Sequence, residues 1–455
     1  MREARALSGI SVAVSATMFA QFSISAVETL IVARLGVEQL AGVTLALSIY
    51  LLLFLFALGV VTAVTPIVAG AYGRGDMEDL RLSGQQAFWV GLSFSVPGML
   101  ILLACRSLAG SAIGAGVEAD SAAAYLAGAA WGLPAWVSYV AVRCLAIATG
   151  RVRITTVIML ASVPVHAGLT WLLVFGGLGL PAFGAFGAGV AYALTAFAAL
   201  ALLAVVLQAS PQGPFGSVFR RPFVLDRNRY GAIIRLGIPF ACRILLREGV
   251  LPCAAFVIAP FGAAAVAAHA VAARVVELTG VFSFGFSDAA NMRVSYAIGA
   301  SAPDRARHAG WIAIQLAAGV SLVVAGALIA ERLSVARWVL GDTDPAGVLA
   351  AAALLPVAAC LQFLEGVQSA AGGALSGLRD AKGPLLIAIF GSWIVGMPAG
   401  ILLARLAAAP VNGMWWGLAV GGCLTTCLYL FRLRRKMARK PGHRSGGRIG
   451  PDRGN

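Results

Sequence analysis

The sequence predicts an all-α integral membrane protein with twelve transmembrane helices in two six-helix bundles. Two observations carry this prediction: the apolar composition, and a succession of span-length apolar segments interrupted once by a polar, basic stretch. Of the 455 residues, 60% are hydrophobic and 12% are charged, with a mean hydropathy of +0.88. Soluble domains are about 45–50% apolar and about 25% charged. The solvent of this chain is therefore largely lipid.

Twelve apolar segments are long enough to cross a bilayer, which takes about 20 residues of helix. In the first half they lie at 8–33, 42–70, 84–104, 122–148, 155–175 and 183–207. In the second half they lie at 232–259, 266–298, 309–330, 347–376, 384–406 and 413–431. The polar break between them predicts a first bundle over residues 1–208, a cytoplasmic linker over 209–230, a second bundle over 231–433 and a basic tail over 434–455.

The distribution of Lys and Arg predicts the orientation of the chain. If the N-terminus is inside, the inner segments and the tail hold 23 basic residues and the outer segments hold 5. Cytoplasmic flanks carry such an excess, so both termini are predicted in the cytoplasm and the protein in the cell membrane. The tail begins FRLRRKMARK directly after the last span, which predicts contact with anionic lipid. It has no interleaved aromatic residues, so we expect no nucleic-acid partner.

An internal repeat is visible at a spacing of 226 residues. Gly36, Gly59 and Gly73 fall onto Gly262, Gly285 and Gly299, and several alanines match in the same register. Six spans per half keep the two halves in the same orientation, related by an axis along the membrane normal. Parallel halves with a site between them are typical of a transporter.

Acidic residues inside the spans are the first candidates for function. A carboxylate costs roughly 2.5–3.5 kcal/mol at the centre of a membrane helix, so Glu28, Glu248 and Glu365 each need a partner, a proton or a task. We interpret them as facing a cavity between the halves, where they carry the coupling cation or bind a cationic substrate. The alternative is that each is a neutral acid hydrogen-bonded to a neighbouring helix.

Other ionisable residues in the spans have simpler interpretations. Arg274 and Glu277, three residues apart, are predicted to pair on one helix face. Arg247 adjoins Glu248, but neighbours on a helix point about 100° apart, so they are not expected to pair. Arg143 is expected to snorkel or to pair internally. A lone histidine, His166, either packs in the core or titrates in the physiological range.

Seven segments resemble, in order, motifs of the multidrug and toxic compound extrusion (MATE) family, closest to its bacterial NorM-like members. They are Leu35-Gly36 through Leu40-Ala41, Ala71–Asp76 (AYGRGD), Phe175–Leu194, Leu236–Gly249 (LGIPFACRILLREG), Ala267–Val271 (AAHAV), Arg293–Ala300 (RVSYAIGA) and Leu361–Pro384. The similarity covers nearly the whole chain. It implies two bundles forming a V around a central cavity, alternating access, and export of organic cations in exchange for H⁺ or Na⁺.

The resemblance places the family's membrane carboxylates on Glu28, Glu248 and Glu365. Glu28 and Glu365 stand where the family usually has Asp, and His166 replaces a customary Asn. Thr170 stands in place of an Asn or Asp, and Tyr192 in place of a small hydroxyl residue. These changes remove oxygen ligands that a hard cation such as Na⁺ prefers. We therefore expect proton coupling at Glu28, with His166 as its near neighbour, and Na⁺ at Glu28 as the alternative.

Further candidates follow from the same resemblance. The residues expected to contact substrate in the cavity are Tyr192, Thr170, Arg243, Arg247, Gln362 and Gln368. The expected partner is a small organic cation or amphipathic molecule, the chain is expected to be a monomer, and no cofactor or other metal site is predicted.

Three other functions were weighed. A major-facilitator drug/H⁺ antiporter also has two six-helix halves, but its basic signature after the second helix is missing from GAYGRGDMEDLR. A lipid-linked oligosaccharide flippase of the MATE superfamily has a strongly basic cavity, and Arg143, Arg243 and Arg247 leave that possibility open. A membrane enzyme is not expected, because the sequence has no HExxH, paired Asp motif or nucleophile elbow.

Overall fold

The computed structural model describes residues 2–113, 116–209, 224–341, 345–407 and 409–438. Within these ranges it has eleven helices long and apolar enough to cross a membrane, and a twelfth span if one bent pair is counted. The predicted fold class is confirmed. Most of the predicted linker (210–223) and most of the tail (439–455) lie outside the described residues, and the domain boundaries stay a prediction.

The first half contains six spans, one of them bent. They are α1 (Arg2–Val32), α2 with its continuation α3 (Val37–Thr62 and Val64–Arg74), α4 (Met77–Ile113), the pair α5 and α6 (Val117–Ala129 and Gly132–Ala148), α7 (Val152–Phe175) and α8 (Gly184–Gln208). The axes of α5 and α6 differ by 48°. Pro134 explains the break, because it has no N–H to offer the carbonyl of Ala130 and its ring crowds that carbonyl.

The second half repeats this plan. Its helices are α10 (Arg227–Ile258), α11 (Ala263–Gly299), α12 (Pro303–Ala330), α13 (Arg332–Leu340), α14 (Pro345–Gly377), α15 (Lys382–Ala388), η3 (Ile389–Gly396), α16 (Met397–Leu406) and α17 (Pro410–Ala438). The short α13 was not predicted. The predicted eleventh span is also irregular, because η3 has the wider π-helical turn. Pro398 follows it and cannot donate to residue 394, which favours this local widening.

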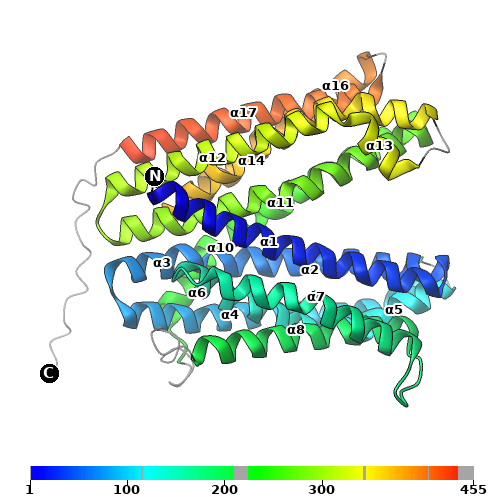
Figure 1. Cartoon of the computed structure of the whole chain (residues 1–455), viewed down its shortest axis with the longest axis horizontal. Coiled ribbons are helices and arrows are strands. Elements are labelled where there is room, and N and C mark those ends of the chain that lie inside the picture. Colours follow the sequence, from blue (N-terminus) through cyan, green and yellow to red (C-terminus); the bar gives the residue numbers. More distant parts are fainter. Residues whose placement is uncertain (1, 114–115, 210–223, 342–344, 408, 439–455) are drawn as a thin grey trace.

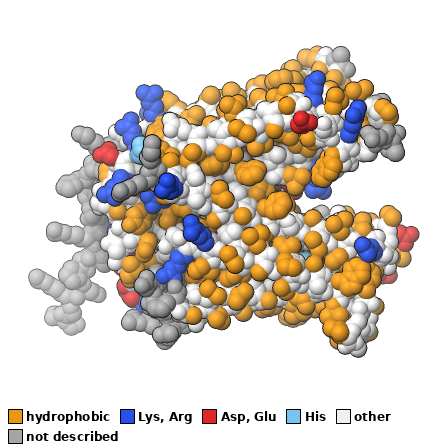
Figure 2. All heavy atoms as spheres, viewed as in Figure 1, with side chains coloured by type: hydrophobic (Ala, Val, Ile, Leu, Met, Phe, Trp, Pro, Cys, Tyr) orange, Lys and Arg blue, Asp and Glu red, His pale blue; other side chains and the backbone are white. Residues whose placement is uncertain are grey.

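The two halves form a V (Figure 1). Helices α1–α8 form one arm and α10–α17 the other. The arms meet at the end that holds the start of α1, the end of α17 and the α3–α4 and α11–α12 turns, which we call the closed end. They diverge at the end that holds α5, α13 and α16, the open end. Figure 2 shows the hollow between the arms at the open end, and apolar side chains over most of the visible surface.

Helix α1 crosses from one arm to the other. Near its start, Leu7 is buried among residues of α11, α12, α14 and α17. The Ser15 hydroxyl donates to the Val281 carbonyl of α11 at 3.4 Å. Near its end, Ile31 and Val32 belong to the core of the first half. The first helix of the first half is therefore anchored to the second half at the closed end.

Helix α10 makes the reciprocal crossing. Ile233, near its start, and Ala241, near its middle, lie in the core of the first half. Ala254 and Ile258, near its end, pack with residues of α16 and α17. The two halves thus exchange the starts of their first helices, as expected for two copies of one plan related by an axis through the closed end.

Two of the three repeated glycine pairs, Gly59/Gly285 and Gly73/Gly299, mark contacts between the halves. A Cβ on Gly59 would lie 2.5 Å from the Ala241 Cα of α10, and a Cβ on Gly285 would lie 2.3 Å from the Ser15 Oγ of α1. Gly299 continues the pattern, since its Cβ would lie 2.1 Å from the carbonyl oxygen of Gly70 on α3. Small residues let membrane helices approach backbone to backbone. Glycine at these two repeated positions is therefore required by the contact between the halves, whereas Gly36 and Gly262 have positive φ and open space around them.

Ion pairs add to the closed end. Glu3 at the start of α1 accepts two hydrogen bonds from Arg293 of α11, at 2.7 and 2.5 Å. Asp380, in the turn between α14 and α15, accepts from Arg432 of α17 at 2.7 and 3.0 Å and lies 3.5 Å from the Lys436 Nζ. These contacts fix the ends of spans that have few other polar partners.

We expect Asp380→Asn to destabilise the protein by about 1–2 kcal/mol at pH 7. This is less than for a fully buried ion pair, because Arg432 is partly exposed and solvent screens the interaction. Burial alone would raise the pKa of Asp380, but Arg432, Lys436 and the Gly383 N–H together hold it below the ordinary value of 3.8. A lowered pKa means that this stabilisation is complete above about pH 4–5 and is lost as the pH falls through the lowered value. The apparent melting temperature of the wild type should therefore fall more steeply below pH 4 than that of the variant.

The matched control is Asp304→Asn, which removes an exposed carboxylate near the start of α12. It should change the melting temperature little. Equal stability of Asp380→Asn and wild type at pH 7 would contradict the role given to this ion pair.

Candidate functional site

The first of two polar sites surrounds Glu28 in the first half. Its side chain is fully buried. The Tyr125 hydroxyl of α5 donates to Glu28 Oε1 at 3.1 Å, and Oε2 has no hydrogen-bond partner among the described residues. Helix α1 places Glu28 there because its second part packs into the first half.

Aromatic rings enclose this carboxylate. Tyr192 of α8 lies at their centre, with ring centroids 5.3 Å from Tyr50 and 5.7 Å from Trp136. Tyr50 and Tyr192 are within electrostatic range of Glu28. The Tyr50 hydroxyl and the Trp136 N–H are buried without a partner among the described residues. A negative charge here has one phenolic donor and otherwise apolar surroundings, so it is costly.

His166 of α7 lies edge-on to Tyr192, with ring centroids 6.0 Å apart. Its Nδ1 lies 3.0 Å from Thr195 Oγ1 and its Nε2 lies 3.3 Å from Thr170 Oγ1. The Thr195 hydroxyl donates to the Ala191 carbonyl, so it accepts from His166, which assigns the proton of a neutral ring to Nδ1. His166 and Thr170 are fully buried.

The direct hydrogen-bond partner of Glu28 is Tyr125, which was not predicted. Tyr192 interacts with both Glu28 and His166, and the pairing of His166 with Glu28 in coupling stays a prediction. Tyr125 and Tyr50 carry no charge and lie within apolar segments, so the sequence does not set them apart from packing residues. The polar end of a buried tyrosine is not visible in a pattern that is apolar throughout.

The second site lies in the other half and is built around Arg247. Its Nη2 lies 3.1 Å from Glu248 Oε1 and 3.3 Å from Glu365 Oε1, which brings α10 and α14 together. Its guanidinium also lies 4.3 Å from the centre of the Phe284 ring of α11 and 3.4 Å from Ser369 Oγ. The three charged side chains are 24–39% exposed.

The prediction that Arg247 and Glu248 would not pair is wrong. Their Cβ atoms do point about 100° apart, but the arginine side chain is long enough to turn back toward its neighbour while it reaches Glu365. The prediction that Arg274 and Glu277 pair on α11 is confirmed, at 2.8 Å. Arg143 is buried rather than snorkelling, within electrostatic range of Asp288 of α11.

The remaining predicted contacts lie around these sites. Arg243 stacks on Phe240, 4.6 Å from the ring centre. Gln362 is 1% exposed, and its Oε1 has no partner among the described residues. Gln368 donates to the Gly422 carbonyl at 3.0 Å. Their role as substrate contacts stays a prediction, as does that of Thr170 and Tyr192.

The two sites differ in charge. In the first half one carboxylate has no cationic partner among the described residues, whereas in the second half two carboxylates share one arginine. No group of three or more His, Cys, Asp and Glu residues in the described ranges could hold a metal ion.

Known proteins match this chain over nearly its whole length. A sequence profile of the MatE family matches residues 13–172 and 253–402. A probable multidrug resistance protein NorM of Bradyrhizobium diazoefficiens is 31% identical, over 93% of this chain and 92% of its own length. Its counterpart in Rhodopseudomonas palustris is 33% identical, over 92% and 89%.

Solved structures show the same fold. An outward-facing multidrug resistance MATE family transporter of the MOP superfamily aligns with a TM-score of 0.86 at 19% identity, covering 96% of both chains. The eukaryotic MATE transporter AtDTX14 aligns with a TM-score of 0.82 at 20% identity, covering 96% of this chain and 98% of its own.

We expect Tyr125→Phe to cost about 1–3 kcal/mol of stability, because it leaves both oxygens of Glu28 without a donor. Tyr50→Phe is the matched control. It removes a buried hydroxyl that has no partner in the described structure, so it should cost less than about 0.5 kcal/mol or stabilise slightly. Apparent melting temperatures of the purified variants measure both effects, and equal losses would contradict the Tyr125–Glu28 hydrogen bond.

We expect Arg247→Gln to cost about 2–3 kcal/mol, because it leaves two carboxylates without their shared cation in partly buried surroundings. Arg274→Gln removes an arginine that is 74% exposed from a simple pair, and should cost less than about 1 kcal/mol. Adding Glu365→Gln to Arg247→Gln should recover part of the loss. Purely additive effects in this double-mutant cycle would show that the pair is not coupled.

Proposed function

The chain belongs to the MatE family of multidrug efflux transporters, and from this premise we propose that it exports organic cations and amphipathic drugs in exchange for protons. It is a membrane transporter and not an enzyme. The observation that carries the proton proposal is the fully buried Glu28, whose one hydrogen-bond donor in the described structure is a tyrosine.

The surroundings of Glu28 favour H⁺ over Na⁺. A hard cation of that kind needs several oxygen ligands. Glu28 has the Tyr125 hydroxyl beside it, whereas His166 and Thr170 are hydrogen-bonded to one another. A proton needs only the carboxylate itself. Protonation removes the negative charge, whose burial among aromatic rings is unfavourable, and deprotonation restores that unfavourable free energy.

The site around Arg247 supports a cationic substrate. Glu248 and Glu365 are partly exposed, so a molecule in the hollow between the arms could reach them. Arg247 pairs its positive charge with the two carboxylates and stacks its flat guanidinium on Phe284. A flat organic cation has the same two properties, a positive charge and a surface that stacks on a ring. We propose that the substrate competes with Arg247 for Glu365. Since Arg247 is paired with acids, the flippase alternative, which requires a strongly basic cavity, is less well supported.

The conformation fits one half of an alternating-access cycle. If both termini are cytoplasmic, as the Lys and Arg distribution predicts, the V opens to the outside of the cell membrane. Turning it inward requires that the closed-end contacts part, including Glu3–Arg293. We propose that the chain acts as a monomer, because each chain holds both halves of the cavity.

The proposal is tested by uptake of the cationic dye ethidium into everted membrane vesicles that contain the full chain. With an acidic interior and no Na⁺ gradient, the wild type should accumulate dye, and Glu28→Gln should reduce uptake to the level of vesicles without the transporter. Glu277→Gln, which removes a partly exposed span carboxylate outside both sites, should leave uptake close to that of wild type.

Two results would overturn the proposal. Full uptake by Glu28→Gln would remove this residue from coupling, provided that the variant is present in the membrane at wild-type level. Uptake driven by a Na⁺ gradient without any pH gradient would replace the proton with Na⁺.

A further inference from the structure

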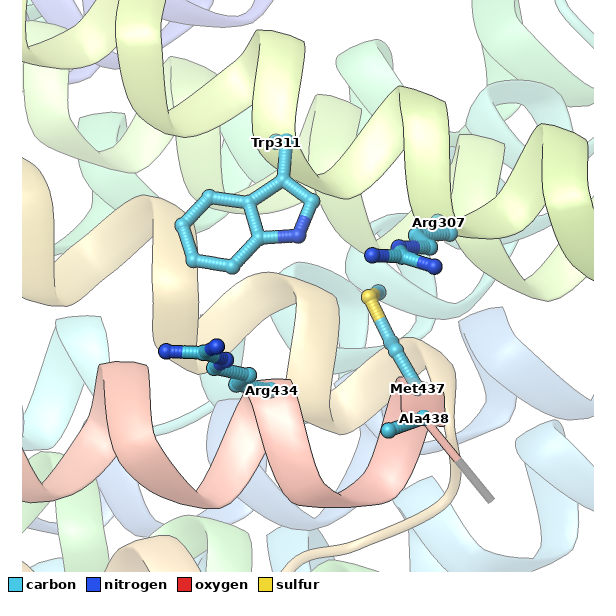
Figure 3. Close-up of a pocket in the computed structure, with 5 residues that line it drawn as sticks. All are labelled: Arg307, Trp311, Arg434, Met437 and Ala438. Carbon is cyan, nitrogen blue, oxygen red and sulfur yellow. The ribbon is translucent and has the colours of Figure 1, made fainter. Parts of the chain in front are cut away.

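A groove of about 450 Å³ lies at the closed end, on the outer face of the second half. It is lined by Arg307 and Trp311 of α12 and by Arg434, Met437 and Ala438 of α17 (Figure 3). The residues of the two helices face one another across the groove. The groove is separate from both polar sites described above and from the hollow between the arms.

The two arginines give the groove an unbalanced positive charge. Within the part of the chain that the structure describes, neither Arg307 nor Arg434 has an ion-pair partner, and no acidic residue lines the groove. Both side chains are exposed. An arginine fork presents several N–H donors that match the oxygens of a phosphate group.

A second groove on another face of α17 provides an internal comparison. It is lined by three basic residues, Arg432, Arg435 and Lys436, together with apolar ones. There, however, Asp380 pairs with Arg432 and Lys436, and Arg435 stacks on Phe431. Basic residues alone therefore do not distinguish the first groove. Neither groove is lined by an acid, but in the first one both arginines also lack an ion-pair partner among the described residues.

The groove lies where a membrane helix meets the headgroup layer. Arg307 and Trp311 are in the first turns of the α12 span, and Arg434 is in the last turns of the α17 span. Tryptophan is enriched at this depth, because its ring is apolar and its N–H is polar. The indole of Trp311 lies beside the space between the two helices.

The floor of the groove is apolar and leads toward the bilayer. Helices α12 and α17 both pack against α14. Gly310 of α12 has no side chain, and a Cβ there would lie 2.7 Å from Met437 Cε and 3.6 Å from Ala374 Cβ of α14. Lipid-exposed apolar side chains continue along the two helices, at Leu322, Val323 and Val420.

We propose that this groove binds one anionic phospholipid, with its phosphate between Arg307 and Arg434 and its glycerol and upper acyl chains over Trp311 and Met437. The anionic phosphate would pair with the two arginines, and the acyl chains would pack on the apolar side chains that continue from the groove. The site is a defined position on α12 and α17, in contrast to the diffuse attraction predicted for the basic tail. It does not depend on the identity of the transported molecule.

The experiment is native mass spectrometry of the detergent-purified full chain, titrated with phosphatidylglycerol. Arg307→Gln/Arg434→Gln should weaken binding of the first lipid roughly tenfold or more, from two lost charge contacts. The matched control, Arg305→Gln/Arg435→Gln, removes the same charge from exposed positions on the same two helices outside the groove, and should weaken it less than about twofold. Phosphatidylcholine of the same acyl length, whose headgroup has no net charge, should bind wild type and both variants alike.

Three outcomes would overturn the proposal. Equal weakening by the two double variants would mean that binding follows overall charge. Unchanged binding by Arg307→Gln/Arg434→Gln would remove the groove from lipid binding. Displacement of the first lipid by millimolar inorganic phosphate would make the groove a site for free phosphate. The lipid-free apparent melting temperature of both variants should equal that of wild type, since the replaced side chains are exposed, and phosphatidylglycerol should raise it for wild type and for the control but not for Arg307→Gln/Arg434→Gln.

Discussion

The backbone-close packing of α1 and α10 across the two arms is the contact on which the rest of the structure depends. Each helix starts in one half and ends in the other, so neither half is complete without the start of its partner's first helix. Gly59 and Gly285 allow this because a side chain at either would overlap α10 or α1, and Gly299 does the same for the contact between α11 and α3. The closed end is therefore a shared core, and the two polar sites lie on the parts of α1 and α10 that return to their own halves.

Upon this symmetric scaffold the charges are placed asymmetrically. Glu28 sits among tyrosine and tryptophan rings, with one hydroxyl donor in the described structure. Glu248 and Glu365 share the guanidinium of Arg247, which also rests on Phe284. On the function proposed above, the first site is the one at which a proton changes the local charge most, and the second is the one at which an organic cation replaces an arginine. In that proposal, one half binds the coupling ion and the other binds the substrate.

Much of the fold could be predicted from the sequence, because span length, turn glycines and charge in lipid are local properties. The spans, the glycine repeat and the Arg274–Glu277 pair follow from such patterns. The partners of Glu28 and Arg247 do not, since they depend on which helices meet and on how far a long side chain reaches. The π-helical turn at Ile389–Gly396 also escaped prediction, although Pro398 beside it is a local signal. The bent α5–α6 pair shows the same limit, because an apolar run has the same composition whether straight or bent.

Helix α1 has no internal proline, and it carries Glu28 near one end and Glu3 near the other. The 25 residue-to-residue steps from Glu3 to Glu28 span roughly 37 Å at about 1.5 Å per step. A stiff rod of that length acts as a lever. A tilt of about 5° at the carboxylate would displace the far end by roughly 3 Å, which is comparable to the length of a hydrogen bond. A small repacking at a deeply buried acid would thus be enough to separate two charged side chains on the opposite face of the membrane.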